Sequence, residues 1–294
     1  MKIYTFDSFK QTWGKIDWAS INQFKVYMQV KRNLKDLKKC VNIQDEKGRT
    51  PLMMAVQSSL PFIVKMLAQN ENMINATDRN EETALMYAIK NGRENIIKML
   101  IDNGADIHKQ NKFGHTALMM AVDLGLTDTV KILLDYGAHV NTVDKEGNTA
   151  LMWAVQHDRT EMVQMLINAG AAVNMQDNTG KTALMLTSYN ENRHIIKKLI
   201  FANADIDMTD NIGRKASDYT SEPEFLERCI QDKLKYERIK ELKQLMTMQN
   251  STIQKLSEEI ETPVLEPQPV RKHIALDFFD TLQYVWSDIK QKIR

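Results

Sequence analysis

The chain has 294 residues, of which 43 % are hydrophobic, and its 39 basic and 38 acidic side chains leave a net charge of +1. This length and apolar content allow a continuous core and exclude a disordered chain. The balanced charge gives no overall attraction to nucleic acid or to an anionic membrane, so nucleic acid is not expected as a partner. A basic run between Lys25 and Lys39 is interpreted as a solvated face, with a patch for an acidic protein or nucleic acid as the alternative.

The cysteines and the N-terminus indicate the compartment. Cys40 and Cys229 lie far apart and have no metal-ligand spacing, so we expect two reduced thiols. The first residues lack the pattern of a signal peptide, and nowhere do 18 apolar residues follow one another. These features predict a cytoplasmic protein without a membrane span, or one that acts in a host-cell cytoplasm if it is an exported effector.

A seven-residue phrase recurs every 33 residues. The five copies are TPLMMAV at residue 50, TALMYAI at 83, TALMMAV at 116, TALMWAV at 149 and TALMLTS at 182. In each period two short apolar stripes at helical spacing are separated by breaker residues and followed by a polar stretch. A fixed period of this size predicts stacked helix-turn-helix units, because one unit alone cannot bury its apolar face.

These units resemble the ankyrin repeat family. The resemblance covers residues 45 to about 219. It rests on DEKGRTPLMMA from Asp45, DKEGNTALMWA from Asp144, GADIH from Gly104, GAHVN from Gly137 and GAAVN from Gly170. It implies an all-α solenoid of helix-turn-helix-hairpin units, in which a threonine caps each first helix and a left-handed glycine ends the second.

The predicted core repeats in every unit. The core leucines are Leu52, Leu85, Leu118, Leu151 and Leu184 on the first helices and Leu67, Leu100, Leu133, Leu166 and Leu199 on the second. Small side chains that allow close helix approach are Ala55, Ala88, Ala121 and Ala154. Methionines replace the family's histidine at Met53, Met86, Met119, Met152 and Met185. In the family that histidine bonds to loop backbone, so we expect looser hairpins and core roles for the methionines, with an adaptable binding surface as the alternative.

The chain divides into five predicted parts. They are a degenerate N-terminal capping unit at 1–44, ankyrin repeats with a closing cap at 45–220, a long helix at 221–261, a Pro-rich linker at 262–271 and a C-terminal amphipathic helix at 272–294. Apolar residues at alternating steps of three and four form coiled-coil-like seams at 239–260 and 275–293. The seams can pack on each other, dock on the last repeat, or form a homo-oligomer with another copy.

No catalytic, cofactor or metal motif is found. Gly180-Lys181-Thr182 resembles the end of a phosphate-binding loop, but Met175 stands where that motif needs a glycine. The aspartates that recur once per unit, at positions such as Asp45 and Asp144, are expected to bond to turn backbone rather than to act as paired catalytic carboxylates. The sequence therefore predicts no enzyme and no cofactor.

The resemblance implies that a partner protein lies on the concave surface formed by the hairpin tips and the first helices. Carried over by position, the candidate partner-binding residues are Arg79, Glu82, Lys112, Phe113, His115, Asp123, Leu124, Lys145, Glu146, Asn148, Gln156, His157, Lys181 and Tyr189. Phe113 is the strongest candidate, because an aromatic side chain at a hairpin tip has little to pack on without a partner. Tyr87 and Trp153 share a position on the first helices, and burial between units is favoured over contact with a partner.

Three functional hypotheses follow. The favoured one is a non-catalytic interaction module or adaptor that binds a protein on the concave surface. The second is a structural assembly protein that oligomerises through its C-terminal helices. The third is a host-directed effector of an intracellular bacterium or virus, because such organisms use ankyrin proteins without companion domains.

Overall fold

The structure is a computed structural model, and it describes residues 44–261, with side chains up to residue 255. The predicted N-terminal capping unit with its basic run and Cys40, the Pro-rich linker and the final helix lie outside the described residues. Between residues 44 and 261 the chain forms helices joined by turns, with two isolated backbone bridges and no strand.

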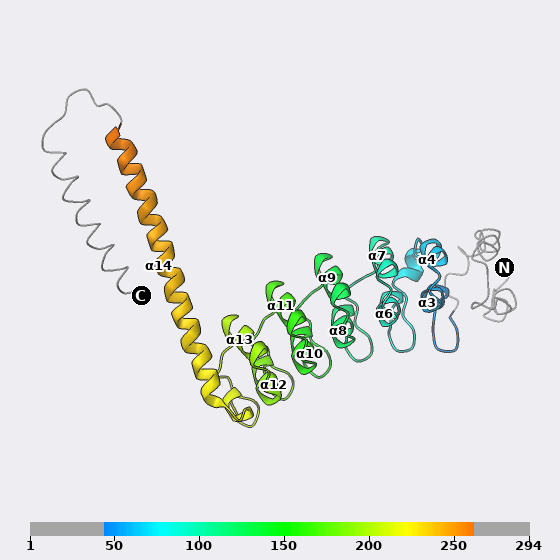
Figure 1. The fold of residues 1–294 in the computed structure, drawn as a ribbon. Coiled ribbons are helices and arrows are strands. Elements are labelled where there is room, and N and C mark those ends of the chain that lie inside the picture. Colours follow the sequence, from blue (N-terminus) through cyan, green and yellow to red (C-terminus); the bar gives the residue numbers. More distant parts are fainter. Residues whose placement is uncertain (1–43, 262–294) are drawn as a thin grey trace, which may run out of the picture. The chain divides into compact units, whose positions relative to one another are not determined.

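Five helix pairs follow one another between residues 51 and 201. They are α3 (Pro51–Gln57) with α4 (Pro61–Leu67), α6 (Ala84–Lys90) with α7 (Glu94–Asp102), α8 (Ala117–Asp123) with α9 (Thr127–Asp135), α10 (Ala150–Gln156) with α11 (Thr160–Asn168), and α12 (Ala183–Asn190) with α13 (Arg193–Phe201). The short α5 (Glu71–Ile74) follows the first pair. First helices form one row, second helices form another, and hairpin loops extend beyond the row of first helices (Figure 1). This arrangement confirms the predicted all-α solenoid.

The helix boundaries follow from the repeated phrase. Each first helix begins after a threonine whose hydroxyl accepts a hydrogen bond from the amide of the methionine three residues later, at 3.2–3.3 Å. This is the N-cap arrangement expected of threonine. Gly104, Gly137 and Gly170 have φ values of +88°, +80° and +86° after the second helices. The threonine caps of the first helices and the left-handed glycines after the second helices are therefore both confirmed.

The core consists of the positions that recur. Nine of the ten predicted leucines are at most 1 % exposed, and Leu67 is 8 % exposed. The four alanines and the five methionines of the repeated phrase are also buried, which confirms core roles for these methionines.

In two units the methionine that replaces the family's histidine itself bonds to backbone. The sulfur of Met53 accepts from the amide of Thr50 at 3.4 Å, and that of Met119 accepts from the amide of Thr116 at 3.5 Å. Each pair thereby forms a capping box in which the thioether replaces the usual carboxylate. The first helices α3 and α8 thus each have a second hydrogen bond at the N-terminus, although no histidine is present there.

The hairpins are also well bonded rather than loose. In each of the six described hairpins, an Asp or Asn oxygen accepts from the amides two and four residues later: Asp45, Asp78, Asn111, Asp144, Asp177 and Asp210. The predicted turn role of the aspartates is confirmed. Adjacent hairpins are joined by backbone bonds such as Lys145 N to Phe113 O at 3.1 Å. A Cβ at Gly114 would lie 2.8 Å from the Lys145 nitrogen, so this close approach requires glycine.

The closing unit keeps the hairpin but not the helix pair. After the hairpin at Asp210, only the 3₁₀ turn η1 (Ala216–Tyr219) covers α12. Lys215 stands where other units have the capping threonine, which explains why no full first helix begins there.

The tail begins with α14 (Pro223–Glu261), which confirms the predicted long helix. Proline suits its first turn, because the amide that proline lacks would have no partner there. The chain divides into two compact units, one that ends at Leu226 and one that starts at Glu227. None of the helices in residues 44–261 has both the length and the apolar character needed to cross a bilayer.

Candidate functional site

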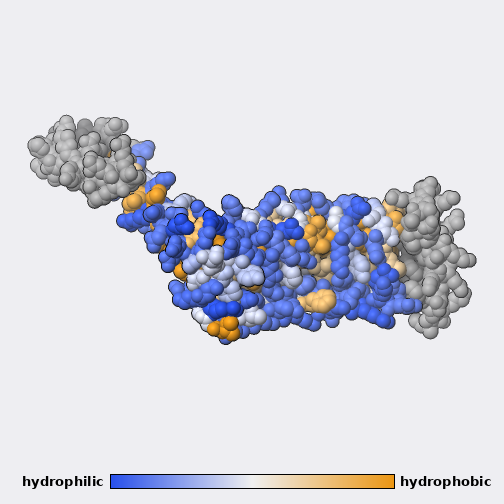
Figure 2. Space-filling model, turned by 60° about the horizontal axis from the view of Figure 1, so that its bottom comes forward, coloured by the Kyte–Doolittle hydropathy of each residue, from blue (hydrophilic) through white to orange (hydrophobic). Residues whose placement is uncertain are grey.

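We use the term hairpin face for the surface formed by the hairpin tips and the exposed ends of the first helices. It corresponds to the surface that the sequence analysis expects to be concave. Figure 2 shows a largely hydrophilic surface interrupted by separate hydrophobic patches. Such a surface favours recognition by a few side chains over burial of one broad apolar area.

Four rings form a continuous array in the middle of the hairpin face. Phe113 and His115 have ring centroids 5.8 Å apart, His115 and Trp153 are 5.2 Å apart with their planes at 78°, and Trp153 stacks on His157 at 5.8 Å. These distances are those of favourable aromatic pairs. We call these four residues the aromatic array, which brings together three of the predicted partner-binding residues.

Trp153 is the member that the sequence analysis did not include among the partner-binding residues. It is half-buried, and its indole nitrogen donates to Asp144 Oδ2 at 2.9 Å. The prediction that Trp153 is buried is therefore correct in part, but the Trp153 ring also contacts the rings of His115 and His157. A signal was present in the sequence, since tryptophan stands at a position that holds Met54, Met120 and Leu186 in three other units.

Tyr87 is bonded in the same way as Trp153. Its hydroxyl donates to Asp78 Oδ2 at 3.0 Å, and the ring is half-buried. Burial and this bond to a carboxylate raise the pKa of Tyr87. The residue thus holds its own hairpin in place.

Charged groups surround the aromatic array. The ammonium of Lys112 lies 5.0 Å from the centroid of the Phe113 ring and donates to Asn80 Oδ1 at 2.6 Å. His157 Nε2 lies 3.1 Å from an Asp123 oxygen. Leu124, which is 46 % exposed, follows Asp123, and the exposed Lys145 and Glu146 occupy the next hairpin tip. The array therefore combines apolar rings with both signs of charge.

Some predicted residues do not join this group. Arg79 is exposed on the hairpin before it. Glu82 is only 5 % exposed and pairs with Lys90 at 2.5 Å, so this residue is corrected from a partner contact to an internal one. Asn148 is half-buried, and its amide donates to Asp144. Buried groups that already have partners gain little from a ligand.

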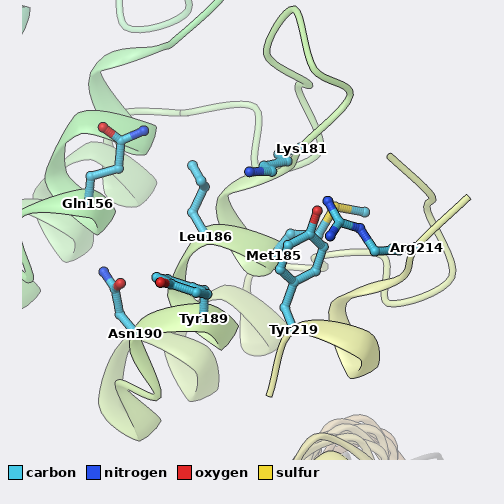
Figure 3. A pocket seen from close by; sticks show the side chains of 8 residues that line it. All are labelled: Gln156, Lys181, Met185, Leu186, Tyr189, Asn190, Arg214 and Tyr219. Atoms are coloured by element: carbon cyan, nitrogen blue, oxygen red, sulfur yellow. The ribbon is translucent and has the colours of Figure 1, made fainter. Parts of the chain in front are cut away.

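The remaining predicted residues lie together in the last units. Gln156, Lys181 and Tyr189 line one pocket of about 520 Å³ with residues of α12 and the closing unit (Figure 3). Ile212, which is 72 % exposed, was not among the predicted residues. It occupies the same hairpin position as Phe113, three units later. The shared position in the period was the signal that could have identified it.

One cluster has donors that suit a metal ion. Ligand atoms of His115, Asp144 and Glu146 lie within 4.8 Å of one another. The Asp144 carboxylate, however, already accepts bonds from the Trp153 indole and from the amides of Glu146 and Asn148. These bonds are those of a turn aspartate, and they already account for the arrangement of the three side chains.

Comparison with known proteins decides the family. The model for ankyrin repeats in three copies matches residues 21–111 and 103–177, and the model for the single ankyrin repeat matches residues 179–211. The chain belongs to the ankyrin repeat family. The ankyrin fold is typically an interaction scaffold without catalytic activity, and it acts in general as a protein-protein interaction module. Comparison with curated proteins gave no significant match.

The ankyrin solenoid also has solved relatives. One is the crystal structure of the ankyrin repeat domain of Bcl-3, described as a unique member of the IkappaB protein family. It is similar to this chain with a TM-score of 0.60 and 28 % identity, over 67 % of this chain and 93 % of the other. The family-model matches end at residue 211, so the tail from Pro223 lies outside the matched residues.

Proposed function

We propose that this protein is a non-catalytic adaptor that binds a partner protein on the hairpin face, with the aromatic array at the centre of contact. The observation that carries the proposal is the continuous contact of four rings across neighbouring units. Phe113 is 50 % exposed, although it is aromatic and lies at a hairpin tip. Exposed aromatic side chains held in fixed positions are typical centres of binding energy.

The framework around the array supports this role. Asp144 holds the Trp153 indole, and Asp123 lies beside His157, so the rings keep their positions before a partner arrives. Because ordered side chains lose less entropy on binding, a pre-formed array of this kind favours affinity. The charged tips at Lys112, Lys145 and Glu146 add selectivity at the rim.

The test uses the full chain and a matched control. Phe113→Ala removes half-exposed aromatic surface from the array, and Tyr136→Ala removes a ring that is 45 % exposed at the end of the second helix α9. Proteins captured from a cell lysate by the natural chain and by both variants are quantified by mass spectrometry, and one captured protein is then purified for affinity measurement.

We expect Phe113→Ala to weaken binding of that protein by about tenfold or more, and Tyr136→Ala to leave it unchanged. Equal loss in both variants, or no loss in either, contradicts a binding site at the aromatic array. Thermal unfolding of both variants shows whether a loss comes from damage to the fold.

A second candidate function is self-assembly through α14. Along residues 239–255 the half-buried side chains are Leu242, Met246, Gln249 and Ile253, and the others are exposed. These four positions follow the spacing of the predicted coiled-coil seam. Light scattering of the full chain and of a chain that ends at Leu226 tests this candidate. A dimer that dissociates on truncation supports it, and a monomeric full chain contradicts it.

A further inference from the structure

At one repeated position of the hairpin face, a lysine lacks the polar partner that its counterparts in the other described units have. This position lies four residues after the turn Asp or Asn that recurs in each described hairpin, and it holds Arg49, Glu82, His115, Asn148, Lys181 and Arg214. Five of these side chains have a polar partner: Arg49 with Asp45 at 2.6 Å, Glu82 with Lys90 at 2.5 Å, His115 with Asp144 at 3.8 Å, Asn148 with Asp144 at 3.4 Å and Arg214 with Asp210 at 2.9 Å. Among the side chains described up to residue 255, the Lys181 ammonium has no such partner.

The sequence of this unit explains why Lys181 differs. In three other units the residue eight positions later supplies a polar partner, namely Gln57 for Arg49, Lys90 for Glu82 and Gln156 for Asn148. Here that position holds Tyr189, and among the described side chains no hydrogen bond joins it to the Lys181 ammonium. The aspartate four positions earlier, Asp177, bonds to Thr179 and to the Lys181 backbone instead.

The Lys181 side chain lies against a ring at the edge of a pocket. Its ammonium is 5.6 Å from the centroid of Tyr219, and the residue is half-buried. Arg214 lies over the same ring at 4.5 Å, but its charge is offset by Asp210. The Tyr219 hydroxyl is also engaged, because it donates to Asp210. One uncompensated positive charge, that of Lys181, therefore remains on this wall.

The pocket offers different chemistry on its other sides. Lys181, Arg214 and Tyr219 lie on one side and Gln156 and Asn190 on the other, with Leu186 and Tyr189 between them (Figure 3). Its volume of about 520 Å³ falls within the range of about 300–1,000 Å³ typical of ligand pockets. The Tyr189 side chain is 74 % exposed, so the apolar floor is open to a partner.

We propose that this pocket receives an acidic side chain from an extended segment of the partner protein, with Lys181 as its ion-pair partner and a neighbouring apolar side chain on Leu186 and Tyr189. The proposal deepens the binding function proposed for the hairpin face and rests on it. An aspartate or glutamate of the partner supplies the negative charge that Lys181 lacks among the described side chains. The side-chain amides of Gln156 and Asn190 can bond to the backbone of the segment. Because Lys181 is half-buried, water screens its charge less than it would screen a charge on an open surface.

The test is selection of peptides from a random, unphosphorylated library on the full chain. We expect the selected peptides to carry Asp or Glu beside an aromatic or aliphatic residue. A selected peptide is then measured against two variants. Lys181→Met keeps the apolar stem over Tyr219 but removes the charge, and Lys131→Met removes an exposed charge from the second helix α9 as the matched control.

We expect Lys181→Met to weaken the peptide by about tenfold, and Lys131→Met to have no effect. Replacement of the acidic residue in the peptide by its amide should cause a similar loss, and the two losses should not add. Unchanged thermal unfolding of Lys181→Met ensures that the loss is not one of folding.

Three outcomes overturn the inference. They are selected peptides without acidic residues, binding that survives Lys181→Met, and a selection that enriches no peptide at all. Peptides that are lost with Phe113→Ala but kept with Lys181→Met would support the aromatic array as the binding site and refute the acidic subsite alone. The two proposals are thereby distinguished.

Discussion

One position of the first helices alternates along the repeats between aromatic and aliphatic side chains. The aromatic residues are Tyr87, Trp153 and Tyr219, and the residues of the intervening units are Met54, Met120 and Leu186. Each aromatic side chain donates to the turn aspartate nine residues earlier. Where no aromatic donor is present, Arg49 bonds to Asp45, and Asn111 replaces aspartate altogether. The three buried turn aspartates, Asp78, Asp144 and Asp210, thus each receive a side-chain donor at the second carboxylate oxygen, which offsets the cost of burying a charge.

Glu81 is a residue under backbone strain. It has a φ of +60° at the hairpin position where the other described hairpins have glycine. A side chain in this left-handed region destabilises the fold by about 1–2 kcal/mol. Glycine removes this strain, but its greater conformational freedom in the unfolded chain cancels part of the gain. We expect Glu81→Gly to raise the free energy of unfolding by about 1 kcal/mol, measured by urea denaturation. Gly114→Ala is the opposite control and should lower it, because its Cβ would meet the Lys145 backbone.

Asp210 gives the closing unit a dependence on pH. Burial by itself would raise its pKa, but hydrogen bonds from Tyr219 and from the backbone and side chain of Arg214 hold the pKa of Asp210 well below its usual range. The same contact, with burial, raises the pKa of Tyr219 to about 12. Because the folded pKa of Asp210 is lowered, its stabilisation is fully present above the usual value of about 3.9 and is lost as pH falls below it.

Asp210→Asn tests this dependence. Asn111 accepts the same two amide bonds in its own hairpin, so asparagine fits the turn. We expect the variant to be less stable than the natural chain at pH 7 and to lose less stability between pH 5 and pH 2, as measured by urea unfolding at several pH values. An identical pH dependence in both proteins would show that Asp210 has no such effect.

At the scale of the element, no helix pair is stable by itself. The first helices have seven or eight residues, and isolated helices shorter than about 12–15 residues are marginal in water. Their stability comes from packing, since first helices of successive units contact each other and also contact their own second helices. A change in one core side chain therefore weakens two interfaces at once.

Leu118 and Phe113 belong to the same unit but have opposite roles. Leu118 is 1 % exposed in α8, and Phe113 is 50 % exposed at the preceding hairpin. We expect Leu118→Ala to lower the free energy of unfolding by about 2–5 kcal/mol through the cavity it leaves. Phe113→Ala should change it by less than about 0.5 kcal/mol, as for surface substitutions generally. Similar losses in thermal unfolding would contradict the assignment of Phe113 to recognition.

At the scale of the whole molecule, the solenoid depends on its ends. Each unit contacts only its neighbours, so a terminal unit must cover the apolar surface of the one before it. The closing unit does this with η1 and with bonds back to the preceding helix pair, among them Arg193 with Glu222 and Ser221 with Glu191. The compact unit that contains the repeats extends to Leu226.

Two truncations test this end of the solenoid. A chain that ends at Leu226 keeps the closing unit, and we expect its repeats to unfold at the same urea concentration as those of the full chain. A chain that ends at Thr209 loses the hairpin and η1, and we expect a lower midpoint because α12 is uncovered. If the shorter chain is equally stable, residues 210–226 do not act as a cap.

The period, the helix pairs, the buried leucines, the threonine caps and the turn aspartates could all be predicted from the sequence. These features are local or repeat at one position of the period, so a single pattern is enough to predict them. The tail helix from Pro223 was also predictable, because no glycine or internal proline interrupts it.

Only the tertiary structure decided which exposed positions are available for binding. Glu82 and Lys181 occupy the same place in the period, yet one is buried in a pair with Lys90 and the other has no anionic partner in the described part of the chain. Trp153 enters the aromatic array through contacts with His115 and His157 on two hairpin-face elements. Such contacts join side chains from different units or from different positions of one unit, and their distances depend on packing rather than on the periodic pattern.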